Sequence, residues 1–149
     1  VGAANERAEK TGSPAAAMEL DDGTIITGKT TNLLGASAAL LLNVVKVLGN
    51  ISHDIHLIAP SAIEPIQKLK VNYLGSKNPR LHTDEVLIAL SASAATDHNA
   101  QVALEQLPKL KGREVHTSVL LSDVDTKIFK KLGVNLTCEP IYEEKKIYH

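Results

Sequence analysis

Aromatic side chains are scarce in this sequence: they make up 3% of the 149 residues, and tryptophan is absent. The core must therefore be built from leucine, isoleucine, valine and alanine. Single-stranded nucleic acids are usually bound by stacking the bases on aromatic side chains, so this shortage argues against that function. An excess of charge is also missing, because 16 basic and 17 acidic residues give a formal net charge of −1. The sequence thus offers no electrostatic footprint for DNA, RNA or an anionic membrane.

Cysteine is almost absent too. Cys138 stands alone, which excludes an internal disulfide and a cysteine zinc cluster and favours a reducing, cytoplasmic setting. The longest apolar stretch contains Asn43 and Lys46 and falls short of the ~20 residues that a membrane-spanning helix needs. His53 and His56 are close in sequence but are not expected to share a face, and we predict no metal site.

What the sequence does contain is an alternation of strand and helix patterns. Residues 16–20, a turn at 21–23 and residues 24–28 predict a β-hairpin. Further strands are expected at 55–59, 85–92, 114–121 and 134–138, and helices at 2–10, 33–48, 61–74, 97–110 and 123–132. Strand, helix and strand repeat three times, which indicates parallel crossover units. We therefore predict one α/β domain over residues 1–149: a three-layer sandwich with a mainly parallel sheet, helices on both faces and an N-terminal antiparallel hairpin, ending in a polar tail at 140–149.

Residues that can cap helix N-termini precede most of these helices. The expected caps and capping boxes are Thr31 or Asn32, Ser61 with Glu64, Thr96 or Asp97, and Ser122 with Asp125. The helix at 33–48 is apolar on almost every side, which predicts that it is buried on several sides.

One stretch matches a catalytic motif letter for letter. Residues 23–30 read GTIITGKT, which fits the phosphate-loop pattern G-x-x-x-x-G-K-[ST]. In a true phosphate loop, flexible backbone N–H groups surround the phosphates. Here the loop positions hold the β-branched Ile25 and Ile26, and Asp21 and Asp22 place carboxylates where phosphates would approach. We therefore interpret the stretch as a hairpin strand rather than a nucleotide-hydrolase loop.

Three other places could carry a site. Residues 28–31 precede a helix N-terminus and are suited to bind some anion. The hydroxyl-rich residues 91–97 would follow a parallel strand, where ligands bind in open α/β sheets, although they can equally serve as helix caps. The polar loop at 75–83 is either a functional loop or a solvated connection. The candidate ligand-binding residues are Gly28, Lys29, Thr30, Arg80, His82, Ser91, Ser93 and Asp97. Catalytic residues and cofactors stay unknown.

The hairpin and the stretches TGKTTNLLGASAALLLN and LGSKNPRLHTDEVLIALS resemble the C-terminal part of a bacterial family of unknown function, number 1846, also called uncharacterised protein family 0371. The resemblance runs over essentially the whole chain. It implies a domain excised from a longer cytoplasmic bacterial protein, and it implies no activity and no catalytic residue. A looser similarity to cytidine-deaminase-like folds stops short of their chemistry, because the chain has neither H-x-E nor P-C-x-x-C.

Two functions are consistent with these patterns. The one we favour is structural: the domain self-associates into a homo-oligomer or packs on its own N-terminal domain, as the apolar helix at 33–48 suggests. The alternative is that it contributes part of a binding or catalytic site for a small anionic, phosphate-bearing ligand, which the N-terminal domain completes. In that alternative the candidate residues named above hold and orient the anion.

Overall fold

The computed structural model describes residues 2–5 and 15–139. Its four strands are β1 (Ala15–Glu19), β2 (Ile25–Lys29), β3 (Glu114–Thr117) and β4 (Asn135–Cys138). Its helices are α2 (Ala36–Leu48), α3 (Pro60–Lys68), α4 (Thr83–Ala94), α5 (His98–Glu105) and α6 (Asp123–Lys131), with a π-helical segment η1 (Leu69–Tyr73) and a 3-10 turn η2 (Leu107–Leu110). Residues 2–5 form a further helical turn.

The α/β class is right, but the predicted mainly parallel sheet is wrong. The strands form one sheet in the order β2-β1-β3-β4. β1 pairs antiparallel with both β2 and β3, and β3 pairs parallel with β4. Of the three expected crossover units, the described residues contain the one in which α6 joins β3 to β4. The other two are missing because residues 55–59 and 85–92 are not strands.

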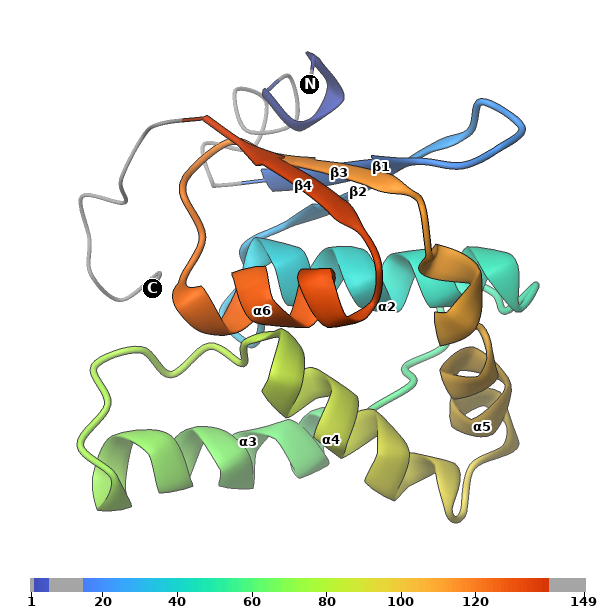
Figure 1. The fold of residues 1–149 in the computed structure, drawn as a ribbon. Helices are drawn as coiled ribbons and strands as arrows, with labels where there is room; N and C mark the ends of the chain where they lie inside the picture. Colours follow the sequence, from blue (N-terminus) through green and yellow to red (C-terminus); the bar gives the residue numbers. More distant parts are fainter. Residues whose placement is uncertain (1, 6–14, 140–149) are drawn as a thin grey trace.

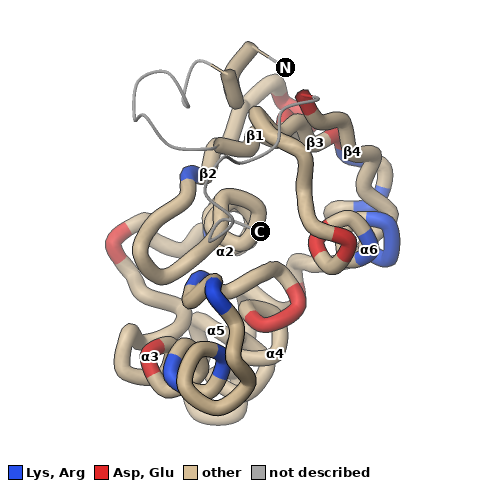
Figure 2. The backbone as a smooth tube through the Cα atoms, turned by 90° about the vertical axis from the view of Figure 1, so that its left-hand side faces the viewer, with Lys and Arg blue, Asp and Glu red and all other residues tan. Residues whose placement is uncertain are grey.

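Helices α2 to α6 form two layers on the same side of the sheet. Figure 1 shows α2 and α6 packed beneath the strands, with α3, α4 and α5 beneath them in turn. Figure 2, turned by 90°, gives the same order of layers. Helices α2 to α6 therefore do not cover both faces, which corrects the prediction. The layers are sheet, helix and helix, an order that requires a middle helix with apolar side chains on several sides.

Helix α2 meets this requirement because it belongs to two hydrophobic clusters. Its Leu40 and Val44 pack beneath the sheet together with Phe129 of α6. Its Ala38 and Val45 belong to a second cluster, which includes side chains of α3, α4 and α5. The prediction that this helix is buried on several sides is confirmed.

The segment expected to be the most buried strand is helix α4. Its buried residues Val86, Ala89 and Leu90 follow the i, i+3, i+4 spacing of one helical face. Ile88 points elsewhere and is 69% exposed. A strand buried on both faces would have covered Ile88 as well, so the apolar run misled the prediction.

The segment at 55–59 is an irregular connection rather than a strand. Its neighbours Leu57 and Ile58 are both buried, at 2% and 3% exposed, in the second cluster. Two adjacent buried residues do not fit the alternation of a half-buried strand. This connection instead packs these two side chains between α2 and α3.

The N-terminal hairpin is confirmed, and its glycines have structural roles. Gly23 takes a positive φ of 86° in the turn, which glycine adopts without strain. A Cβ at Gly28 would clash with the backbone nitrogen of Leu40 and lie 2.9 Å from the carbonyl oxygen of Ala36. Gly28 therefore allows β2 to touch the backbone of α2, which explains the second glycine of the motif-like stretch.

Two of the expected caps are confirmed, but the capping box expected at Ser122 is not completed, because the Asp125 carboxylate accepts from Thr83 instead. The Asp97 side chain accepts a hydrogen bond from the Asn99 N–H at the start of α5. Ser122 accepts one from the Asp125 N–H at the start of α6. Both helix starts were therefore readable from local sequence.

The other two expectations for caps are wrong. Helices α2 and α3 begin after Gly35 and Ala59, and neither has a side-chain cap. The Thr31 hydroxyl instead accepts from the N–H groups of Leu33 and Leu34 and closes a local turn before α2.

Two predictions fall wholly or partly outside the described residues. The polar tail at 140–149 lies outside them, and of the helix expected at 2–10 only residues 2–5 are described. Within the described ranges, no helix combines the length and the apolar character that crossing a membrane requires.

Candidate functional site

The starts of α2 and α4 are held side by side by backbone hydrogen bonds. The Leu81 N–H donates to the Leu33 carbonyl at 2.9 Å, and the Gly35 N–H donates to the Leu81 carbonyl at 3.1 Å. The Arg80 Nε also donates to the Thr31 carbonyl. This short parallel pairing brings residues from distant parts of the sequence to one place.

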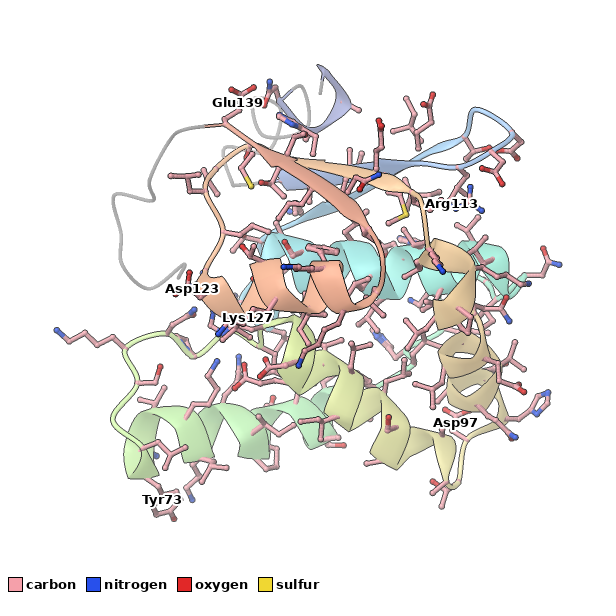
Figure 3. All side chains as sticks on the ribbon, in the orientation of Figure 1. Tyr73, Asp97, Arg113, Asp123, Lys127 and Glu139 are labelled. Carbon is pink, nitrogen blue, oxygen red and sulfur yellow. The ribbon has the colours of Figure 1, made fainter. Side chains whose placement is uncertain are left out.

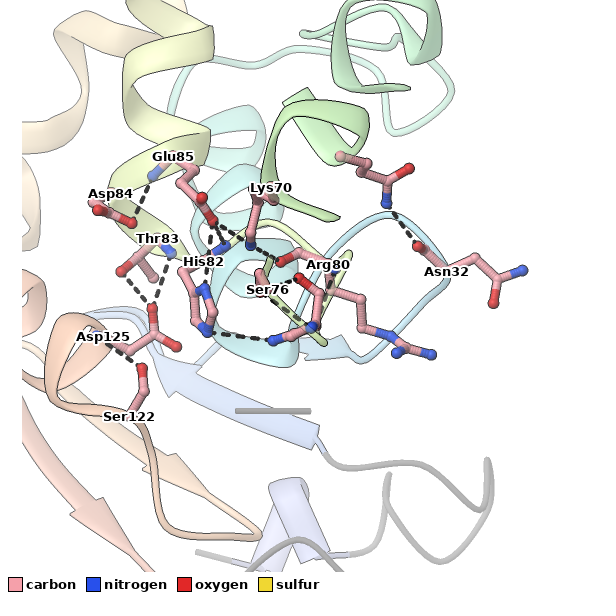
Figure 4. A network of polar contacts seen from close by, with 12 residues as sticks. Asn32, Lys70, Ser76, Arg80, His82, Thr83, Asp84, Glu85, Ser122 and Asp125 are labelled. Carbon is pink, nitrogen blue, oxygen red and sulfur yellow. Dashed lines mark hydrogen bonds and ion pairs between the residues drawn. The ribbon is translucent and has the colours of Figure 1, made fainter. Parts of the chain in front are cut away.

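The start of α6 is joined to the start of α4 by a buried carboxylate. The Asp125 Oδ1 accepts hydrogen bonds from the Thr83 N–H at 2.9 Å and from the Thr83 hydroxyl at 2.7 Å, as Figure 4 shows. Thr83 is fully buried and Asp125 is 7% exposed. A carboxylate at a helix N-terminus is favourable because it meets the free N–H groups and the helix dipole. Three helix starts therefore meet at one point.

A small pocket of about 20 Å³ lies where these helix starts meet. Its walls include Ser37 of α2, Arg80 and His82 before α4, and Ser122 and Asp125 at the start of α6. A single water needs roughly 10–15 Å³, so the pocket admits a group of about that size. We call it the three-helix pocket.

Ser37 is the most informative residue of the three-helix pocket. Its side chain is 2% exposed, and its Oγ has no hydrogen-bond partner within the described part of the chain. Buried hydroxyls are nearly always paired, and an unpaired one costs about 1–3 kcal/mol. Because α2 also lacks a side-chain cap, its first N–H groups keep the partial positive charge of a helix N-terminus. One acceptor in this pocket would satisfy both features.

A charged cluster stands beside the pocket (Figure 4). The Glu85 Oε1 accepts from the His82 N–H and from the Lys70 Nζ, both at 2.8 Å, and lies 3.4 Å from the His82 Nδ1. Burial acts to raise the pKa of Glu85, but the hydrogen bonds from His82 and Lys70 outweigh it and lower the pKa to about 2. The hydrogen bond to Glu85 raises the pKa of His82, against the effect of burial. His82 therefore keeps its positive charge to a higher pH than an ordinary histidine.

The loop before α4 is held firmly rather than solvated. The Lys70 Nζ donates to the Arg80 carbonyl at 2.6 Å. The Asn78 Oδ1 accepts from the Arg80 N–H at 3.0 Å, and the Asn78 Nδ2 lies 3.4 Å from the His82 Nε2. Asn78 itself is 5% exposed. These contacts fix the backbone that presents Arg80 and His82 to the three-helix pocket.

Some of the candidate ligand-binding residues come together and others do not. Thr30, Arg80 and His82 all line the three-helix pocket. Lys29 lines a different pocket, because successive residues of an extended segment point to opposite sides. Gly28 packs on α2, as described above. The structure thus divides the anion site expected at residues 28–31 between two pockets.

The residues at the far end of α4 lie away from both pockets. At 1.5 Å of rise per residue, Ser93 is roughly 15 Å from the start of the helix at Thr83. Ser91 is exposed, and Asp97 caps α5. Figure 3 shows Asp97 and Asp123, which begins α6, at opposite ends of the molecule. Residues 91–97 were expected beside a strand end, and they are not there because α4 is a helix.

Two residues of the pocket were not identified as site residues from sequence. Ser37 had one signal, a hydroxyl in the first turn of an otherwise apolar helix. Asp125 was recognised as part of a helix cap, but its contact with Thr83 joins residues 42 positions apart. Only the packing of α6 against α4 reveals that contact.

The three-helix pocket combines hydrogen-bond donors with charged residues of both signs. Its lining includes Ser37 in the first turn of α2, the basic residues Arg80 and His82, and the acidic Asp125. Within the described residues, no three His, Cys, Asp or Glu side chains are grouped so that they could hold a metal ion.

Comparison with known proteins gives the family. The model described as "Domain of unknown function DUF1846, C-terminal" matches residues 1–148. A UPF0371 protein of Corynebacterium urealyticum is 60% identical over 148 residues, which cover 99% of this chain and 30% of the relative. A UPF0371 protein of Streptococcus pyogenes serotype M5 is 49% identical over 146 residues, which cover 98% of this chain and 30% of the relative.

A third relative, a UPF0371 protein of Corynebacterium diphtheriae, is 57% identical over 140 residues, which cover 94% of this chain and 28% of the relative. The chain thus spans 28–30% of the length of these three relatives. The names of these relatives give no activity. The resemblance noted from the sequence is confirmed, and the chain belongs to the family of the DUF1846 C-terminal domain, whose function is unknown.

Proposed function

We propose that this domain binds a small oxyanion, such as a phosphate group, in the three-helix pocket. The observation that carries the proposal is the Ser37 hydroxyl, which is buried and without a partner among the described residues. It lines a pocket beside the uncapped start of α2. Helix N-termini bind anions through their free N–H groups and their dipole.

The size of the pocket limits how the anion binds. About 20 Å³ accommodates one oxygen of the anion at the position that a water would take. That oxygen accepts hydrogen bonds from the Ser37 hydroxyl and the first turn of α2. The remaining oxygens lie at the mouth of the pocket near Arg80 and His82. A phosphate ester would keep the rest of its molecule outside this domain.

Charges around the pocket support this choice of ligand. His82 has a raised pKa, and Arg80 is a permanent cation. Asp125 is in the same wall, but its Oδ1 already accepts two hydrogen bonds from Thr83. Arg80 offsets this carboxylate, His82 is paired with Glu85, and the uncapped start of α2 adds the partial positive charge that favours an anion over a cation.

The test is thermal unfolding of the full chain with increasing phosphate, against chloride at equal ionic strength. Phosphate should raise the Tm of the native chain in proportion to ln(1 + [phosphate]/Kd). Ser37→Ala should raise the stability without phosphate by about 1 kcal/mol, because it removes an unpaired buried hydroxyl. The same variant should lose most of the response to phosphate.

Ser61→Ala is the matched control, since Ser61 has the same position in α3 as Ser37 has in α2 but is exposed. It should keep the native response to phosphate. If phosphate never raises the Tm of the native chain beyond the effect of chloride, the pocket holds only a water and the proposal is wrong.

A second candidate is packing against the part of the longer relatives that this chain does not cover. Tyr73 and Leu74 are each 71% exposed at the end of η1, and exposed apolar groups often mark contact surfaces. Figure 3 shows Tyr73 at the outer edge of the molecule. The apolar helix α2 no longer supports this function, because α2 is covered within the domain. Light scattering would detect homo-oligomers, and loss of the contact in a Tyr73→Ser, Leu74→Ser variant would locate the surface.

A cytoplasmic location belongs to this proposal as well. Its support is the single cysteine, which suits a reducing compartment. Measuring the cellular fraction that contains the protein would test it.

A further inference from the structure

A second, larger pocket lies on the other side of the segment that follows β2. It has a volume of about 250 Å³ and runs between the end of β2, one face of α2 and the start of α3. Lys29, Lys46 and His56 are its basic lining residues. We call it the lysine pocket. It shares no lining residue with the three-helix pocket.

The floor of the lysine pocket is apolar for a structural reason. From α2 it takes Ala39, Leu42 and Lys46, whose spacing places them along one stripe of the helix. Facing this stripe are Leu57 and Ile58, the two buried residues of the connection between α2 and α3. The irregular path of that connection leaves an open space above the apolar stripe instead of closing it with a strand.

The charge of the lysine pocket has one sign. Two lysines and a histidine line it, and no Asp or Glu is among its lining residues. The Lys29 ammonium makes no hydrogen bond or ion pair with another described residue. The Lys46 Nζ donates to the His53 carbonyl at 3.2 Å. The pocket therefore combines positive charge at its polar wall with an apolar floor.

The positive charge of Lys46 is not fully compensated by a nearby negative charge. Burial lowers the pKa of Lys46, and the negative charge of Asp54 opposes that effect. Asp54 is exposed and does not line the pocket. An anion bound in the pocket would supply the missing countercharge in a partly desolvated place, where such pairs are stronger than in water.

The geometry points to the lysine pocket as a binding site for a small organic anion with an aliphatic body, of the class of short-chain carboxylates. The carboxylate pairs with Lys29 and Lys46, and the hydrocarbon part covers the partly buried side chains of Leu33, Leu34 and Leu42. The volume of about 250 Å³ is just below the range of roughly 300–1,000 Å³ usual for drug-sized ligands. This favours a ligand of only a few carbon atoms beyond its charged group.

The first test compares three probes of nearly equal size on the full chain: hexanoate, 1-hexanol and hexylamine. Binding is followed by NMR chemical-shift changes of the backbone amides. Hexanoate should shift the amides of Leu42 and Leu57. It should bind at least about tenfold more tightly than 1-hexanol, because a charge-assisted hydrogen bond contributes more free energy than a tenfold change in affinity requires. Hexylamine should not bind. Equal affinity for hexanoate and 1-hexanol, or shifts confined to other regions, would overturn the inference.

The second test removes the charges and keeps the aliphatic stems. Lys29→Met and Lys46→Met should each weaken hexanoate binding by about fivefold or more and leave 1-hexanol binding almost unchanged. The matched control is Lys127→Met, on the exposed surface of α6 and away from the pocket (Figure 3). It should keep the native affinity. If both pocket variants bind hexanoate as the native chain does, the lysines do not form the site.

Discussion

The two hydrophobic clusters that share α2 are held together in different ways. The sheet half consists of the four strands, α6 and the α2 side chains beneath the sheet. It is fixed by strand ladders and by backbone contact between β2 and α2. The helical half consists of α3, α4, α5 and the connection before α3. The start of its helix α4 is fixed by a polar cluster around Glu85 and Asp125. The stability of the sheet half should therefore respond most to changes in side-chain volume, and that of the helical half to changes in charge.

Gly28→Ala should have the largest effect, because it attacks the sheet half where backbone meets backbone. The new Cβ would clash with the Leu40 nitrogen and approach the Ala36 carbonyl. Rigid backbone atoms cannot move aside as a side chain would. We expect a loss of about 3 kcal/mol or more in the free energy of unfolding, measured by urea denaturation.

Gly35→Ala is the matched control. The nearest atom to a Cβ at Gly35 would be the Leu81 carbonyl oxygen at 3.8 Å, which is ordinary contact. This substitution should lower the free energy of unfolding by about 1 kcal/mol or less. Equal losses for both variants would show that the contact between β2 and α2 is not the special feature of the sheet half.

Asp125→Ala should have the next largest effect, because Asp125 joins the two halves. It would leave the buried N–H and hydroxyl of Thr83 without their acceptor. We expect a loss of about 2–3 kcal/mol. Asp123→Ala is the control, since Asp123 is an exposed acidic residue in the same turn of α6. This variant should lose less than about 1 kcal/mol of unfolding free energy, which is the favourable interaction of one carboxylate with the helix dipole. A similar loss for both variants would mean that the dipole, and not the link to α4, determines the effect.

Acid should weaken the helical half before the sheet half. The folded pKa of Glu85 is about 2, below its ordinary value of 4.5. Its contribution is therefore fully present above pH 4.5 and is lost as the pH falls from 4.5 towards 2. Because Glu85 is partly exposed, its contribution to the free energy of unfolding is about 2 kcal/mol. Hydrogen exchange should show amides of α4 losing protection in this window while β1 keeps its protection.

His82 adds a smaller dependence of the opposite sign. Its folded pKa is raised above the ordinary value of 6.5, so its contribution is fully present below pH 6.5 and is lost as the pH rises through the folded pKa. Stability should therefore be highest between about pH 4.5 and 6.5. In Glu85→Gln both dependences should nearly vanish. If the variant keeps the native pH profile, other groups are responsible for it.

The same division explains how much of the fold could be predicted. In the sheet half, local signals located the hairpin and the start of α6: turn residues 21–23, the β-branched segment at 24–27, and the Ser122 cap. In the helical half, residues 55–59 and 85–92 were predicted as strands, because short apolar runs do not distinguish a strand from a buried helix face. The secondary structure of these two segments depended on which of their side chains packed in the cluster around α2.

The candidate site was predicted in part for the same reason. Arg80 and His82 were identified as polar residues of a loop, and the structure places them in the three-helix pocket. Ser37 was not identified, because nothing local shows that its hydroxyl lacks a partner. Ser91 and Ser93 were expected at a strand end that does not exist. Whether any of these residues binds a ligand stays a prediction.

The sequence by itself determined the local features: the absence of aromatic stacking platforms, the hairpin turn, two helix caps and the apolar surface of α2 around most of its circumference. These depend on neighbours within a few residues, so composition and spacing are sufficient. The tertiary structure alone decided the direction of the strands and the state of residues 85–92. It also decided that Lys29 and Thr30 enter different pockets. Each of these depends on contacts between distant segments, which local patterns of composition and spacing do not reveal.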